Sequence, residues 1–418
     1  MNGITSLSSE EEKLVGAIDE REVLDYCAKL IEIPSVFGSE HRISEQIASD
    51  LKKFGLKTVS VPVDKCGPSI VGTYSAGSET ERSRGTAALI FNGHMDTVQV
   101  CEGWTRDPFS ARVEGDKLFG LGSVDMKGGL AAAIMAAKAL VSSQVPLKRA
   151  FAMHAVSDEE AWGRGTTALI EHGFYKGAEC CIVAEPSNLN RLRNARRGTR
   201  VIDVLVTGRS THGAQPEHGI NAITESAKVI EVLSKLPDKA HPRIVDFKLQ
   251  PLKSSSCILR IEGGSDALRV PDKCVIRLDR HILPGTTSDE ALQEVKRILD
   301  TNLDKDTRSR VSIEFTPLPP FASPYEPFET KSESNLVKTI LDVSRIFGYA
   351  PSLVAGHSVA DDCLIATFGL PVVSYGPCGD IETHASGRAH ESDEYVYTQQ
   401  VVDAAKIYAV VAHRILNR

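Results

Sequence analysis

The sequence predicts an α/β fold in which a mostly parallel sheet is flanked by helices and interrupted by a smaller, inserted α+β domain. Two observations point to this fold. Short apolar runs typical of buried strands alternate with helical segments in the first and last parts of the chain. Between them the order changes to strand, helix, strand, strand, helix, strand, which is ferredoxin-like. We therefore expect a larger domain of residues 1–198 and 317–418 and an inserted domain of residues 199–316.

The elements of the larger domain follow from apolar runs and from helix start and stop signals. Residues 20–55 are expected to be helical, with a helix start at Ser39-Glu40 and a stop at Gly55. A polar Gly/Ser/Glu turn is expected to join the first two strands. Strands are predicted at 69–74, 87–92, 149–156, 179–184 and 370–375, and helices at 128–140, 165–172, 335–347 and 398–416.

The inserted domain begins with the alternating apolar and polar residues 201–207, which predict a half-buried strand. The Pro-rich stretch 317–320 is expected to be the linker that leaves the domain. Further strands are predicted at 244–250, 257–262, 274–283 and 311–315, and helices at 221–236 and 288–302.

Composition excludes several classes of protein. A net charge of −7 argues against nucleic acid as a partner. No apolar run approaches the roughly 18 residues that span a membrane, and the N-terminal segment is acidic where a signal peptide is basic. Nine cysteines without a Cys-x-x-Cys pair favour reduced thiols over a disulfide framework. We expect a cytoplasmic protein.

Acidic or histidine-containing clusters follow three of the predicted strands. They contain His94 and Asp96, the acidic run 158–160, and Glu185. Because ligands bind beside the carboxyl ends of strands in such sheets, we expect these side chains to converge. Three adjacent carboxylates are unfavourable there unless a cation compensates them. Adjacent glutamates can also divide the work, with one binding metal and the other moving a proton.

Three further residues are weak candidates when each is taken alone. Asp125 precedes the helix at 128–140, where a carboxylate also serves as an N-cap. His390 lies between the last strand and the last helix, and His212 follows the first strand of the inserted domain. Together, two histidines and three carboxylates match the ligand preferences of zinc, cobalt or manganese. The chain has no Gly-x-Ser-x-Gly elbow and no Walker phosphate loop.

Six motifs occur in one order along nearly the whole chain, and with them the chain resembles the M20 family of metallopeptidases and deacylases. That family includes acetylornithine deacetylase, succinyl-diaminopimelate desuccinylase, aminoacylase and glutamate carboxypeptidase. The resemblance implies a zinc-exopeptidase-like larger domain and an inserted lid and dimerisation domain. The motifs are residues 93–98, 122–129, 158–160, 184–187, 210–214 and 389–394.

The resemblance also implies two divalent metal ions, with zinc expected first and cobalt or manganese as alternatives. His94, Asp125 and Glu185 would hold one ion. Asp125, Glu160 and His390 would hold the other, so that Asp125 bridges the two.

Three more roles follow from the same resemblance. Glu159 would be the general base, and Asp96 would orient the imidazole of His94. His212 would reach an active site from the inserted domain, in the family often the active site of the partner subunit.

Three positions depart from the family pattern where relatives help to bind a substrate carboxylate. Leu268 stands where an Asn is frequent, His281 stands at an Arg position, and Cys363 stands where several relatives have Arg. Arg280 is one candidate to replace the cation at position 281. Other cationic candidates are Arg196, Arg197 and Arg200.

We therefore expect a hydrolase that cleaves the amide bond of an N-acylated amino acid, with activated water and a Glu base. A dipeptidase or carboxypeptidase is the alternative, and a catalytically inactive binding protein on the same scaffold is a third interpretation. The expected partners are a small N-acyl amino acid or short peptide and a second copy of the chain, with neither nucleic acid nor membrane.

Overall fold

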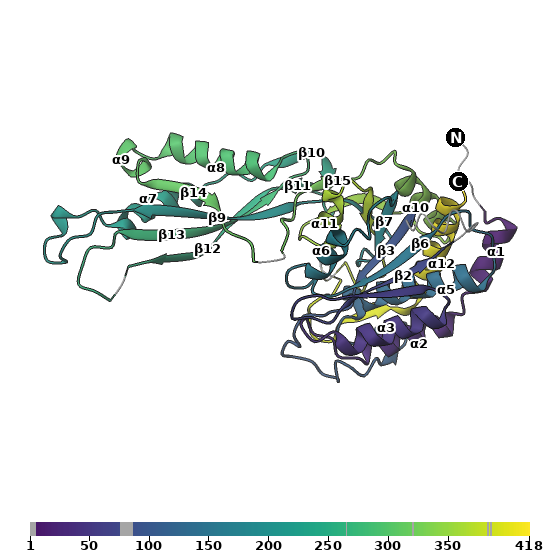
Figure 1. Ribbon diagram of the computed structural model, residues 1–418. Helices are drawn as coiled ribbons and strands as arrows, with labels where there is room; N and C mark the ends of the chain where they lie inside the picture. The colour runs from purple at the N-terminus through teal and green to yellow at the C-terminus, as the bar shows by residue number, and fades with distance from the viewer. Residues whose placement is uncertain (1–5, 76–86, 265, 320–321, 383, 385–386) are drawn as a thin grey trace.

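The computed structural model describes residues 6–75, 87–264, 266–319, 322–382, 384 and 387–418. Most of the expected turn between the first two predicted strands, and Pro320 of the expected linker, lie outside the described residues. The described part confirms the α/β class, with one large and one small sheet in separate parts of the molecule (Figure 1).

The large sheet has nine strands in the order β1-β2-β6-β3-β7-β17-β8-β15, with β16 paired to β8. Its middle strands β6, β3, β7 and β17 run parallel, whereas β1, β2 and β15 pair antiparallel, so the sheet is mixed toward its edges. The strands are β1 (Lys57–Val61), β2 (Ser69–Tyr74), β3 (Leu89–His94), β6 (Phe151–Val156), β7 (Cys180–Val183), β8 (Arg191–Arg196), β15 (Phe328–Glu329), β16 (Ser352–Gly356) and β17 (Val372–Ser374).

Helices cover both faces of the large sheet. The helical stretch expected at 20–55 is two helices, because Pro34 lies in the segment between them and cannot donate a helical hydrogen bond. One face is covered by α5 (Gly128–Ser142) and α12 (Thr398–Leu416), with α1 (Ser9–Gly16), α2 (Glu20–Ile31) and α10 (Asn335–Ile346) packed beside them. Helix α3 (His41–Lys53) packs on this same face, over β1 and β2 and beside α2, whereas the other face is covered by α6 (Arg164–Glu171) and α11 (Asp361–Thr367).

The small sheet is antiparallel and has the order β12-β13-β9-β14. Helices α7, α8 and α9 lie along one of its faces (Figure 1). The chain order β9-α7-β12-β13-α8-β14 is the expected ferredoxin-like order, and the sheet has its own apolar core. Its elements are β9 (Gly198–Thr207), α7 (Ala222–Leu233), β12 (Ser255–Gly263), β13 (Lys273–Ile282), α8 (Ser288–Asn302), α9 (Lys305–Arg308) and β14 (Val311–Phe315).

The prediction of a single strand at 244–250 is wrong, because the chain reverses direction within that segment. It forms a hairpin of β10 (Ala240–Val245) and β11 (Pro251–Lys253). The Asp246 carboxylate accepts hydrogen bonds from the backbone N–H groups of Lys248 and Gln250, which stabilises the turn. Asp246 also bridges to Ala355 of β16, so the hairpin lies against the large sheet rather than in the small one.

The small sheet projects away from the large one and meets it at a crossing of two chain segments (Figure 1). The Thr199 N–H donates to the Tyr325 carbonyl at 2.9 Å where the chain enters and leaves. A Cβ at Gly198 would lie 2.5 Å from Pro327, so glycine permits this crossing. The domain boundaries at 198/199 and 316/317 stay a prediction.

Two further features complete the fold. A three-stranded sheet joins β4 (Val113–Glu114), β5 (Lys117–Phe119) and β18 (Tyr395–Tyr397). Within the described residues, the structure has no helix with the length and apolar character needed to cross a membrane.

Candidate metal centre

The candidate site lies at the carboxyl edge of three neighbouring strands. Strands β6, β3 and β7 are adjacent and parallel, so their carboxyl ends meet at one edge of the sheet. His94 is the last residue of β3, Glu159 and Glu160 follow β6, and Glu185 follows β7. The fold therefore brings together the strand-end residues that the sequence selected.

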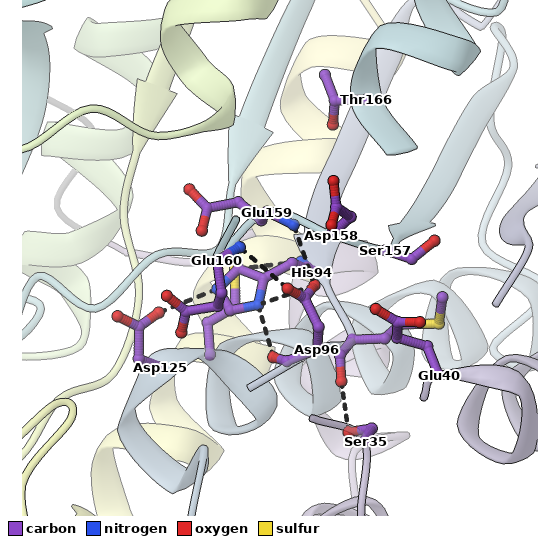
Figure 2. A network of polar contacts seen from close by, with 12 residues as sticks. Ser35, Glu40, His94, Asp96, Asp125, Ser157, Asp158, Glu159, Glu160 and Thr166 are labelled. Carbon is purple, nitrogen blue, oxygen red and sulfur yellow. Dashed lines mark hydrogen bonds and ion pairs between the residues drawn. The ribbon is translucent and has the colours of Figure 1, made fainter. Parts of the chain in front are cut away.

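The buried imidazole of His94 is at the centre of the site. Its Nε2 lies 3.0 Å from Oδ1 of Asp125 and 3.7 Å from Oε1 of Glu185. Its Nδ1 lies 2.9 Å from the backbone oxygen of Asp96, so Nδ1–H donates to that carbonyl. Figure 2 shows Asp125 and Glu160 on one side of the ring and Asp96 on the other. Although burial lowers the pKa of His94, the hydrogen bond to Asp125 and nearby carboxylates raise it well above the ordinary value.

Asp96 contacts His94 mainly through its backbone. Its carboxylate is 3.7 Å from Nδ1 of His94, farther away than its carbonyl oxygen. The carboxylate instead accepts the N–H groups of Glu159 at 3.2 Å and Glu160 at 3.0 Å. Asp96 therefore ties the end of β3 to the loop after β6, and burial raises its pKa to about 7.

Asp125 lies in a single irregular turn, residues Ser123–Lys127, that leads into α5. Glu394 anchors this turn, because its buried carboxylate accepts the N–H groups of Gly122, Val124 and Asp125 at 3.0, 2.7 and 3.1 Å. Burial raises the pKa of Glu394 to about 8, while these hydrogen bonds lower it. Lys127, which is also buried, donates to two backbone carbonyls at the end of α2. The turn is therefore fixed at both of its ends.

A glycine sets how closely α5 approaches the site. A Cβ added at Gly129 would lie 1.9 Å from the carbonyl oxygen of Ala184, at the end of β7. The start of α5 can therefore rest against the backbone next to Glu185 only because residue 129 has no side chain. We expect this close contact to influence the distance between Asp125 and Glu185.

Glu160 and His390 form the outer part of the site. The His390 Nε2 lies 3.0 Å from Oε1 of Glu160 and 3.5 Å from Oδ2 of Asp125. The hydrogen bond to Glu160 raises the pKa of His390 to about 9. Because 47 % of the His390 side chain is exposed, this end of the site is open to solvent.

The three acidic residues after β6 differ in their contacts. The Asp158 carboxylate is bound by Arg164 through Nε at 2.6 Å and Nη2 at 2.7 Å, so it is neutralised within the loop. Glu160 contacts His390, as described above. Within the part of the chain that the structure describes, the Glu159 carboxylate has no such partner, and Figure 2 shows it pointing away from Asp96. Burial raises its pKa well above the ordinary value, with His94 lowering it and nearby carboxylates raising it further.

These residues could hold a divalent metal ion. Ligand atoms of His94, Asp125 and Glu160 lie within 4.8 Å of one another, as do those of His94, Glu159 and Glu185. Because Nδ1 of His94 donates to the Asp96 carbonyl, Nε2 is the ring nitrogen that faces the carboxylate oxygens of Asp125 and Glu185 and that could ligate a cation. Imidazole nitrogens with carboxylate oxygens are the ligands that zinc, cobalt and manganese accept.

The structure does not bring His212 to the site of its own chain. Strand β9 has 10 residues and is therefore roughly 33 Å long. It begins at the crossing with the larger part, and His212 lies beyond its far end, where the side chain is exposed. Nδ1 of His212 accepts the N–H of Ala214 at 3.1 Å.

The positions that depart from the family pattern are also outside the site. Leu268 is 85 % exposed and lies near the tip of the small sheet. His281 contacts Asp279 at 3.4 Å, and the buried Cys363 lies against the backbone oxygen of Arg197 at 3.6 Å. Arg280 is buried and contacts Ser256 at 2.8 Å and Glu294 at 3.6 Å, so its guanidinium has partners within the small sheet.

Sequence reasoning missed two residues that border the site. Glu394 was part of a motif, but nothing in the residue pattern showed that its carboxylate would be buried under the Asp125 turn. Arg193 precedes Arg196 on β8, and its Nη1 lies 3.7 Å from Oε2 of Glu185. The alternation of Arg191, Leu192, Arg193 and Asn194 could have indicated that one face of β8 carries cations.

Comparison with known proteins gives a consistent result. The model of the family described as Peptidase family M20/M25/M40 matches residues 90–414. The chain is 27 % identical to acetylornithine deacetylase of Edwardsiella ictaluri, covering 91 % of this chain and 92 % of the relative. It is 26 % identical to succinyl-diaminopimelate desuccinylase of Hydrogenovibrio crunogenus, covering 93 % and 97 %.

Solved structures share the fold. The aminopeptidase PepT from Bacillus cereus superposes with a TM-score of 0.73 at 18 % identity, covering 96 % of this chain and 100 % of that one. A dinuclear metal binding peptidase of the M20 family from Bacillus subtilis gives a TM-score of 0.67 at 13 % identity, covering 95 % and 98 %.

Proposed function

Because the chain belongs to peptidase family M20/M25/M40 and is a hydrolytic enzyme, we propose that it cleaves the amide bond of an N-acylated amino acid. Its relatives in this family act on acylated amino acids or peptides, which supports this substrate class. One observation carries the proposal. His94, Asp125, Glu160 and His390 form a chain of contacts of 3.0 to 3.5 Å, and Glu185 lies 3.7 Å from the same Nε2 of His94 that Asp125 contacts.

Two divalent ions, zinc in the first place, would be held by these five side chains. His94, Asp125 and Glu185 would bind one, and Asp125, Glu160 and His390 the other, because Asp125 directs one oxygen to each histidine. Bound there, such ions polarise a carbonyl group and lower the pKa of water toward about 7. Asp96 holds Nδ1 of His94 through its carbonyl, which leaves Nε2 free to ligate.

Glu159 is proposed as the general base. Its carboxylate is the one in the acidic run that is engaged neither by Arg164 nor by His390. It would take a proton from the attacking water and later deliver it to the nitrogen of the leaving amine, which breaks the C–N bond. Asp96 positions Glu159 by accepting its backbone N–H.

We propose residues 199–316 as a lid that pairs two copies of the chain. Among the described residues, β12 is hydrogen-bonded only on its β13 side, so its other edge is open. Leu259 and Ile261 on this strand are 57 % and 50 % exposed, which is unusual for apolar side chains of this size. In such a homodimer, His212 of one copy would stabilise the oxyanion formed in the other copy's site.

A substrate panel with metal analysis tests the proposed function. The protein is prepared with zinc, cobalt or manganese and assayed on acetyl- and succinyl-amino acids and on dipeptides. We expect about two metal ions per chain and chelator-sensitive hydrolysis of acyl-amino acids. Faster hydrolysis of dipeptides would instead assign the chain as a peptidase. Bound metal without hydrolysis of any amide would indicate a binding protein.

A further inference from the structure

Strand β8 carries a cation that faces the proposed metal centre. Nη1 of Arg193 lies 3.7 Å from Oε2 of Glu185, and 17 % of the Arg193 side chain is exposed. Its Nε is buried and has no hydrogen-bond partner among the described residues. A buried guanidinium nitrogen without an acceptor is unfavourable, so the position is suited to a group that binds there.

The other arginines of this segment are already engaged. Arg196 forms a buried ion pair with Asp362 at 2.6 Å. Arg197 donates to the carbonyls of His357 and Lys253, which joins the two parts of the molecule. Arg200 stacks at 3.8 Å on an aromatic ring of the small sheet, away from the site. The cations that the sequence suggested for substrate binding are therefore not available.

An aromatic ring holds Arg193 in place. The guanidinium carbon lies 5.2 Å from the centre of the Phe247 ring, which comes from the β10–β11 hairpin. Arg191, two residues earlier, donates through Nε to the backbone oxygen of Phe247 at 3.2 Å and so fixes the hairpin. Stacking on one face restricts the guanidinium while leaving its edge free for hydrogen bonds.

The charges around Arg193 favour an anionic ligand. Its nearest carboxylate is Glu185, and the proposed function assigns that carboxylate to a metal ion. With Glu185 engaged by a metal ion, Arg193 would lose the carboxylate that it contacts. A guanidinium presents parallel N–H donors that match the two oxygens of a carboxylate.

We propose that Arg193, stacked on Phe247, binds a carboxylate of the substrate next to the ion held by Glu185. The inference rests on the proposed function. It narrows the substrate to acyl-amino acids with a carboxylate that can contact the Arg193 guanidinium. That carboxylate belongs either to a dicarboxylic acyl group, such as succinyl, or to the amino acid itself.

Three substrates that differ in whether they have a carboxylate, and in where it lies, test the proposal. N-succinyl-L-alaninamide has its carboxylate on the acyl group, N-acetyl-L-alanine has it on the amino acid, and N-acetyl-L-alaninamide has none. We expect Arg193→Met to lower kcat/KM on the order of 100-fold for one of the two charged substrates and less than about 3-fold for the neutral one. The substrate whose kcat/KM falls in Arg193→Met identifies which carboxylate Arg193 binds. Arg21→Met, at an exposed arginine of α2, is the matched control and should not discriminate among the three.

Metal content and ligand binding separate this inference from the proposed function. Arg193→Met should retain the metal content of the wild type, and calorimetry should show weaker binding of either succinate or alanine but not of uncharged succinamide. If Arg193→Met does not fold, Arg193→Lys should also lower kcat/KM selectively for one charged substrate, by a smaller factor. Equal losses on all three substrates, or no loss, would overturn the role of Arg193. If the wild type cleaves none of them, the proposed function fails instead.

Discussion

The two sheets of this chain treat charge in opposite ways. At the edge of the large sheet, burial raises the pKa of both Asp96 and Glu185 to about 7. On the small sheet, Asp203 of β9 binds Arg277 of β13 through both oxygens, at 2.8 and 2.9 Å, and its pKa is lowered. The small sheet neutralises its charges locally, whereas the large sheet leaves them for a ligand to balance. The chemistry is therefore expected at the edge where charge is uncompensated.

Replacing one carboxylate on each sheet should give the largest contrast. Glu159→Gln removes the proposed base and should lower kcat by about 10³-fold, within the range for general bases. Asp203→Asn removes a structural ion pair and should leave kcat within about 2-fold, since exposed pairs contribute little. Steady-state kinetics with metal analysis checks both, because Glu159→Gln should keep its metal. Wild-type turnover by Glu159→Gln would contradict its role.

His212 tests whether the small sheet contributes to chemistry at all. We expect His212→Ala to lose about 10²-fold in kcat, as for removal of one oxyanion donor. Mixing it with Glu159→Gln chains should restore about a quarter of wild-type activity, because half of the dimers are mixed and one of their two sites is intact. Full activity of His212→Ala alone would show that the small sheet is only structural. Failure of the mixture to recover would show that His212 does not act across a dimer.

A glycine pair tests how strongly the large sheet depends on close packing. Gly129→Ala would place a methyl group 1.9 Å from the Ala184 carbonyl and should cost about 1–3 kcal/mol of stability, together with weaker metal binding. Gly16→Ala is the control, because nothing lies within 4 Å of its added Cβ. Denaturant unfolding and metal titration measure both effects. Unchanged metal affinity in Gly129→Ala would mean that this contact does not set the geometry of the site.

The sequence predicted more of the framework than of the site's surroundings. Helix α8 and strand β14 have the predicted bounds, because their periodicity and caps are local. The chain order of β9, α7, β12, β13, α8 and β14 was also predicted from the element pattern. Short strands such as β16 and β18 were missed, because their pairing partners are distant in the chain and leave no local signal.

The same limit applies to the site. Residues at the ends of apolar runs were found, because the carboxyl ends of parallel strands meet at one edge. Glu394 and Arg193 act through burial and through contacts with distant segments, which no local pattern records. Asp96 was predicted to contact His94, and it does, but through its backbone carbonyl oxygen. This oxygen lies closer to the imidazole ring than the Asp96 carboxylate does.

The last prediction concerns pH. The folded-state pKa values of Asp96 and Glu185, about 7, lie above those of unfolded carboxyls, so the folded protein holds more protons between about pH 4 and 7. With metal removed, the stability of the larger part should therefore fall as pH rises through that window, by about 1 kcal/mol per pH unit for each group. The small sheet should lose the contribution of Asp203 only as pH falls below 4, because the pKa of Asp203 is lowered.

Tryptophan fluorescence can follow this difference, because Trp104 and Trp162, the two tryptophans of the chain, both precede the small sheet in sequence and lie in the larger part. With the metal removed by a chelator, the melting temperature measured from tryptophan fluorescence should decrease from pH 5 to pH 7. In Glu185→Gln this decrease should be smaller than in the wild type. A melting temperature independent of pH would contradict the uncompensated charge on the large sheet.

The crossing of Thr199 and Tyr325 has an evolutionary consequence. Because the chain leaves and re-enters the larger part at neighbouring points, the intervening segment can be exchanged, shortened or lengthened without re-threading the sheet that carries the ligands. Descendants of one ancestral gene could in this way diversify what they recognise while inheriting an unaltered reaction.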